Sequence, residues 1–95
     1  MDFERKQLMK ALAALAIERV LLDAGKPILE KVSNKLKKEY KCYIPDCYDH
    51  PEYLVNVLKS IFGNSYVTIV EQIKGELVEY SDDKDMDILI KTIGR

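Results

Sequence analysis

Apolar residues recur every three or four positions along most of the chain, which is the pattern of helices that bury one face. Glycine, proline and capping residues divide this pattern into five stretches. They predict helices over residues 3–23, 27–41, 50–62, 65–80 and 82–93. Residues 66–70 are also rich in β-branched side chains, but no strand is needed to explain the pattern. We therefore expect an all-α fold, a compact bundle of four to five short helices in a single domain over residues 1–95.

Residues 42–48 have no helical period, and Pro45 disfavours helical backbone at the residue before it. We expect a loop there. Asp49 and Glu52 fit a capping box, which predicts that the next helix starts beside them.

The first predicted helix differs from the others because it is apolar nearly all the way round. Between residues 11 and 22 only Glu18 and Arg19 are polar. A helix on the outside of a bundle normally keeps one polar face, so something should cover the second apolar face. Either this helix runs through the centre of its own bundle, or it packs against the same helix of a second copy. We favour a homodimer that self-associates through Leu12, Ala13, Leu15 and Ala16.

Composition and charge narrow the classes of function. The 15 basic and 16 acidic residues nearly balance, so no overall field attracts nucleic acid or an anionic membrane. The longest apolar run, residues 11–17, is too short to cross a bilayer, and we expect no membrane partner. Two cysteines are too few for a disulfide scaffold, which favours a cytoplasmic location.

Cys42, Cys47 and His50 have ligand types that zinc prefers, at Cys-x4-Cys-x2-His spacing. A structural zinc site needs a fourth ligand, and only Asp46 or Asp49 is nearby. We therefore favour unligated cysteines and a surface histidine. No residues supply a nucleophile together with a base and an orienting group, so we expect no enzyme, no catalytic residue, no metal site and no cofactor.

The acidic residues Asp82, Asp83, Asp85 and Asp87 suggest a calcium loop, because alternate carboxylates can converge on a hard cation. However, Ile88 stands where such a loop requires glycine. We favour a simpler role, in which these carboxylates stabilise the positive end of the last helix.

The second predicted helix has a basic side that includes Lys31, Lys35 and Lys38. Lysines beside tyrosines can contact phosphates and stack on bases. Two glutamates dilute this side, and no nucleic-acid-binding motif is present. We favour a solvated helix face and keep a small nucleic-acid-binding regulator as the alternative function.

Four tyrosines cluster around the expected loop, where they fit an interface or the packing of the loop onto the bundle. We expect Tyr40 and Tyr53 to join the core. Tyr43 and Tyr48 are the expected surface contacts, and with His50 they form the predicted partner-binding residues.

Two segments resemble a known group of domains. Residues 18–27 read ERVLLDAGKP and residues 43–54 read YIPDCYDHPEYL. They are similar to small helical output domains of archaeal signalling proteins, the Nitrosopumilus output domain group, and the likeness covers roughly Ile17 to Leu77. The resemblance implies a non-catalytic protein-interaction or output module in intracellular signal transduction. Its implied partner is a protein, such as a signalling receptor or a receiver module.

Overall fold

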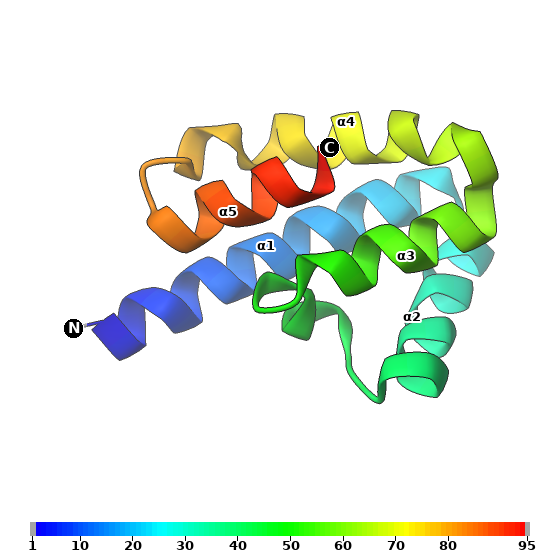
Figure 1. The fold of residues 1–95 in the computed structure, drawn as a ribbon, viewed down its shortest axis with the longest axis horizontal. Coiled ribbons are helices and arrows are strands. Elements are labelled where there is room, and N and C mark those ends of the chain that lie inside the picture. Colours follow the sequence, from blue (N-terminus) through cyan, green and yellow to red (C-terminus); the bar gives the residue numbers. More distant parts are fainter. Residues whose placement is uncertain (1, 95) are drawn as a thin grey trace.

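The structure, a computed structural model, describes residues 2–94, and helices make up most of this part of the chain (Figure 1). The α-helices are α1 (Asp2–Ala24), α2 (Lys26–Tyr40), α3 (Pro51–Phe62), α4 (Tyr66–Leu77) and α5 (Lys84–Ile93). The shorter 3-10 helices are η1 (Ile44–Tyr48), η2 (Gly63–Ser65) and η3 (Val78–Tyr80). No strand occurs within residues 2–94, and the predicted all-α bundle is confirmed.

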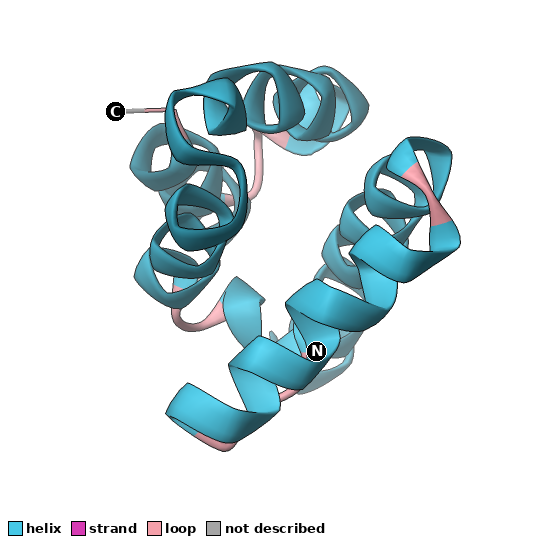
Figure 2. Ribbon diagram, turned by 90° about the vertical axis from the view of Figure 1, so that its right-hand side faces the viewer, coloured by secondary structure: helices cyan, strands magenta, loops and turns pink. Residues whose placement is uncertain are grey.

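Helix α1 is the longest element, and the others are arranged along it. Its 23 residues extend over about 34 Å at the usual helical rise, close to the 37 Å longest dimension of the molecule. Helices α2 and α4 and the η1 segment pack directly on α1, whereas α3 lies against α2 and α5. Figure 2 shows the same helices from the side, joined by short loops. Helix α1 therefore supports α2, α4 and η1 directly, and α3 and α5 pack on these elements.

The centre of the bundle is apolar, and all five α-helices contribute to it. Its large, fully enclosed side chains are Ile17, Leu21, Val32, Leu36, Leu54, Val57, Leu58, Ile73, Leu77, Met86, Leu89 and Ile93. Among the residues that the structure describes, no charged side chain is buried, and the buried side chains with polar atoms are those of Tyr48 and the two cysteines. Burial of apolar surface is therefore the main force that holds the helices together. Within residues 2–94, no helix has both the length and the apolar composition needed to cross a membrane.

The joint between α1 and α2 takes a single residue. Gly25 has a φ of 137°, a conformation that residues with a Cβ atom rarely adopt. Its N–H donates to the carbonyls of Leu21 and Leu22 at 3.1 and 3.0 Å, which ends α1. Pro27 then occupies the first turn of α2, where its missing N–H costs nothing. The glycine and proline that predicted this boundary therefore act as expected.

Residues 42–48 are more regular than the predicted loop, because they contain η1. The carboxylate of Asp46 accepts the backbone N–H of Tyr43 at 2.9 Å and stabilises this short helix at its start. The predicted capping box is also wrong. His50, rather than Asp49, occupies the N-cap position of α3, and it makes no side-chain capping bond.

The last two helices have different boundaries from those predicted. The helix expected over residues 65–80 ends at Leu77 and continues as η3. Helix α5 begins at Lys84, two residues later than expected. Asp83 determines this start, since its carboxylate accepts the backbone N–H of Met86 at 2.9 Å.

Candidate interaction surface

Basic side chains near the start of α1 hold this helix against two acidic turns. The Nζ atoms of Lys6 and Lys10 each lie 3.1 Å from a carboxylate oxygen of Asp49. Nε of Arg5 donates to Oδ2 of Asp83 at 3.0 Å. The two aspartates precede α3 and α5, so these contacts tie α1 to the starts of both helices.

The same contacts lower the pKa values of the two aspartates. The hydrogen bond from the backbone N–H of Met86 lowers the pKa of Asp83, and the Tyr48 hydroxyl and Arg5 add to this effect. Burial alone would raise the pKa of Asp49, but the hydrogen bonds and charges of its two lysine partners lower it. Both carboxyl groups are therefore ionised at neutral pH, and both stabilise the position of α1.

The orientation fixed by these contacts leaves a row of leucines in water. Leu8, Leu15 and Leu22 are 56%, 51% and 53% exposed. They are spaced by seven residues, close to two helical turns, so they lie in line along one face of α1. We name these three residues the leucine ridge. Because the ridge is exposed, the other helices do not surround α1. The alternative in which this helix runs through the centre of its own bundle is therefore wrong.

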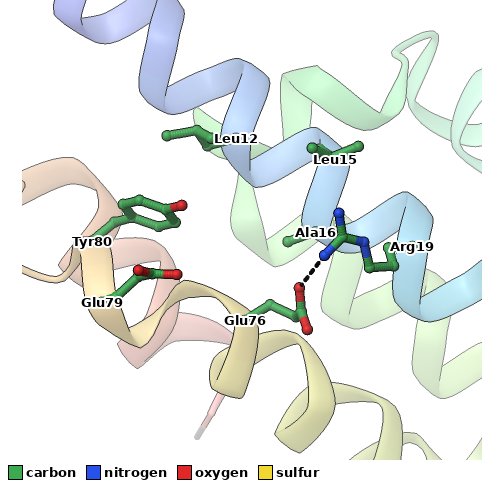
Figure 3. Close-up of a pocket in the computed structure, with 7 residues that line it drawn as sticks. All are labelled: Leu12, Leu15, Ala16, Arg19, Glu76, Glu79 and Tyr80. Carbon is green, nitrogen blue, oxygen red and sulfur yellow. Dashed lines mark hydrogen bonds and ion pairs between the residues drawn. The ribbon is translucent and has the colours of Figure 1, made fainter.

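A groove runs beside the leucine ridge, between α1 and the end of α4 (Figure 3). Its volume is about 110 Å³, and it is lined by Leu12, Leu15, Ala16, Arg19, Glu76, Glu79 and Tyr80. At one end Arg19 Nη1 donates to Glu76 Oε1 at 3.2 Å. At the other end, Figure 3 shows Leu12 across from Tyr80. The groove therefore has a mainly apolar wall on α1, and its opposite wall combines the ring of Tyr80 with two glutamates.

The four residues predicted for self-association divide between two faces of α1. Leu15 belongs to the leucine ridge, and the partly buried Leu12 lines the groove. Ala13 and Ala16 are only 1% and 6% exposed and belong to the chain's own core, so placing them on an outer face was wrong. Their small side chains let neighbouring elements approach α1 closely. The prediction missed the other two leucines of the ridge, although their seven-residue spacing was a visible signal.

Two of the three predicted partner-binding residues lie at the surface. Tyr43 is exposed. His50 is also exposed, and its ring stacks on Tyr53 with 4.7 Å between centroids. Tyr53 in turn stacks on Tyr40 at 4.2 Å, and both tyrosines pack against the core as expected. His50 is thus the outer ring of an aromatic stack between α2 and α3.

Tyr48 is the third, and its predicted surface position is wrong. It is 4% exposed, and its hydroxyl donates to Oδ1 of Asp83 at 2.9 Å. Burial and this bond raise the pKa of Tyr48. The phenol is therefore a neutral structural donor that links η1 to the start of α5.

The lysines predicted for nucleic-acid contact lie on the outer side of α2. Lys31 and Lys38 are exposed, and so is Lys41 just after the helix. Lys35 differs, because it forms an ion pair with Glu39 one turn later. Two of the three predicted lysines therefore lie exposed on this side of α2, and the third, Lys35, is already paired with an acidic residue.

The two cysteines are buried free thiols. Burial raises the pKa of Cys47 to about 12 and also raises the pKa of Cys42, so both thiols are protonated at neutral pH. Within residues 2–94, no three His, Cys, Asp or Glu side chains are grouped so that they could hold a metal ion.

Comparison with known proteins found no family model, curated protein or solved structure that matches the chain. The resemblance to the archaeal output domains, and the function that it implies, stay predictions.

Proposed function

We propose that this protein is a non-catalytic protein-interaction module, which acts in the cytoplasm as an output domain in signal transduction. The observation that carries the proposal is the leucine ridge together with the groove beside it. Exposed apolar side chains that lie in line on one helix face, with charged residues beside them, are typical of protein-binding sites. The signalling role rests on the resemblance of residues 18–27 and 43–54 to archaeal output domains.

A protein partner can use the ridge and the groove together. Full burial of an exposed leucine contributes roughly 1.5–3 kcal/mol, and docking gains about half of this for each of the three ridge leucines because each is already about half buried. The groove admits an apolar side chain between Leu12 and Tyr80. The Arg19–Glu76 ion pair lies beside it and supplies a polar rim that fixes the orientation of the partner.

The test is affinity capture from an extract of the source cells, with the wild type and two variants as bait. Leu15→Lys places a charge at the centre of the ridge. Ile88→Lys is the matched control, because Ile88 is also about half exposed but lies on α5. We expect protein partners that the wild type and the control retain and Leu15→Lys loses. Identical captured sets for all three baits would contradict the proposal.

The second candidate is a small nucleic-acid-binding regulator, and the exposed Lys31 and Lys38 favour it. Contacts between lysines and phosphates release counterions, so the affinity must fall steeply as salt increases. Fluorescence anisotropy with labelled DNA and RNA at low salt tests this function directly. Salt-sensitive binding that is lost in Lys31→Glu/Lys38→Glu would support it, and absence of binding at low salt would remove it.

A further inference from the structure

The leucine ridge is self-complementary about Leu15, and we infer that a second copy of this chain covers it. In this dimer, α1 packs antiparallel on α1 across a two-fold axis at Leu15. The inference rests on the proposed function, because it names the partner of the same surface.

The spacing of the ridge fits this arrangement. Leu8 and Leu22 lie seven residues before and after Leu15. In an antiparallel pair centred on Leu15, Leu8 of each copy therefore lies level with Leu22 of the other copy. The three contacts extend over about 21 Å of helix, and a seven-residue repeat keeps them in one seam. Every exposed leucine of the ridge thus meets a leucine.

The charges at the two ends of α1 agree with the antiparallel direction. Glu4 lies in the first turn of α1, and Lys26, the first residue of α2, lies just beyond the end of α1, which Glu4 of the other copy approaches in the antiparallel pair. Arg5 comes within one turn of the level of Asp23 of the other copy. Arg5 contacts Asp83 only through Nε, which leaves the terminal nitrogens of its guanidinium for a second carboxylate. Opposite charges therefore meet at both ends of the seam.

A parallel pair would bring like charges together. Each residue would then lie level with the same residue of the other copy. Glu4, Glu18 and Arg19 would each face an identical charge. The two helix dipoles would also point the same way, whereas they oppose each other in the antiparallel pair. The surface chemistry of α1 thus favours one direction only.

The groove beside the ridge fits the same dimer. Arg19 of the second copy lies level with Ala11, next to Leu12 in the groove. The opposite wall carries Glu79, which has no ion pair among the residues that the structure describes. A basic side chain of the second copy thus lies beside an acidic wall of the groove, and it can keep its ion pair with its own Glu76 because a guanidinium has several donors.

Sedimentation velocity over a series of protein concentrations tests the association. We expect a wild-type dimer, a dissociation constant raised about 100-fold in Leu15→Lys, and no change in Ile88→Lys. Lys26→Glu should weaken the dimer about fivefold, because Glu4 would then face a like charge. The double variant Glu4→Lys/Lys26→Glu should restore it. A wild type that is monomeric at every concentration would overturn the inference.

Disulfide cross-linking under mild oxidation tests the register and the direction. Leu15→Cys should cross-link to itself across the axis. Leu8→Cys alone should not, because its two copies would lie about 21 Å apart, but a mixture of Leu8→Cys and Leu22→Cys should. The native thiols are buried, and the wild type serves as the control for them. Self-cross-linking of Leu8→Cys would show a parallel pair and overturn the inference.

The two proposals fail in different ways. If the wild type is monomeric while Leu15→Lys loses a partner from the extract that Ile88→Lys keeps, the second-copy inference fails and the proposed function stands. If Leu15→Lys changes neither self-association nor capture, both fail. Circular dichroism of each variant confirms that it is folded, which we expect because Leu15 is half exposed.

Discussion

One carboxylate, that of Asp83, joins three parts of the chain, and its replacement tests how far this junction stabilises the fold. Oδ1 accepts the backbone N–H of Met86 and the hydroxyl of Tyr48, each at 2.9 Å. Oδ2 accepts Nε of Arg5 at 3.0 Å. The change Asp83→Ala removes the helix cap and the ion pair, and it leaves a buried hydroxyl without its acceptor.

These losses differ in size. Loss of an N-cap costs about 1 kcal/mol, and a buried donor left unpaired costs about 1–3 kcal/mol. The exposed pair with Arg5 contributes only about 0.5 kcal/mol. We therefore expect Asp83→Ala to lower the free energy of unfolding by about 3 kcal/mol, a large part of the roughly 5–15 kcal/mol of a small domain.

Urea denaturation of the wild type, Asp83→Ala, Tyr48→Phe and the double variant measures this effect. Tyr48→Phe removes the hydroxyl that the first change leaves unpaired, so the double variant should cost about 1–2 kcal/mol less than the two single changes together. The control is Asp85→Ala, which removes only a charge from the first turn of α5. Additive effects, or a cost of Asp83→Ala no larger than that of the control, would refute the reasoning.

The same variants have a predicted pH dependence. The pKa of Asp83 in the folded protein is lower than its ordinary value of 3.8. The contribution of ionised Asp83 to the stability of the folded protein is therefore fully present above that value. It is lost as the pH falls through the pKa that Asp83 has in the folded protein. The free energy of unfolding of the wild type should fall on acidification below about pH 4, and that of Asp83→Ala should fall less. Parallel pH profiles for the two proteins would contradict this assignment.

Burial and backbone geometry give four further expected outcomes. Leu54→Ala should lower the free energy of unfolding by about 2–5 kcal/mol because Leu54 is fully buried, whereas Ile88→Ala should cost less than about 1 kcal/mol in the same urea titration. Gly25→Ala should destabilise by roughly 1 kcal/mol or more because its φ is 137°. Gly75→Ala should instead stabilise α4 by about 0.5–1 kcal/mol, since an added Cβ would meet nothing within 4 Å, and thermal melting should show these opposite signs. Cys47, with its pKa raised to about 12, should react with a thiol reagent only after unfolding, and prompt labelling of this residue in the native protein would disagree with its burial.

The helices could be predicted from the sequence because their causes are local. Spacing of three or four residues identifies a buried face without any knowledge of its neighbours. Gly25 and Pro27 likewise determine the joint between α1 and α2 through their own backbone preferences. The seven-residue spacing of the leucine ridge is equally local. Composition alone does not identify this ridge, because the alanines between Leu8 and Leu22 make α1 apolar nearly all round, and only the direction of each side chain separates the exposed leucines from the buried alanines.

The wrong predictions concern residues whose partners are distant in the sequence. Tyr48 has the size and polarity of a surface contact, and only a carboxylate 35 residues later makes it a buried donor. Asp49 fits a capping box locally, but lysines about 40 residues earlier bind it instead. Local preferences of about 1 kcal/mol are easily exceeded by such tertiary contacts. No spacing rule within one helix can indicate them.

The contact between Arg5 and Asp83 joins residues that are 78 positions apart. On a ribosome that adds 5–20 residues per second, about 4 to 16 s pass between the synthesis of these two residues. Helix α1 is made first, yet α4, which covers part of its inner face, is made during the second half of this interval. The nascent chain therefore carries an apolar helix for seconds before α4 can cover its part of the inner face. The rate at which the second half of the chain is translated therefore sets how long the apolar face of α1 stays uncovered and open to association with other chains.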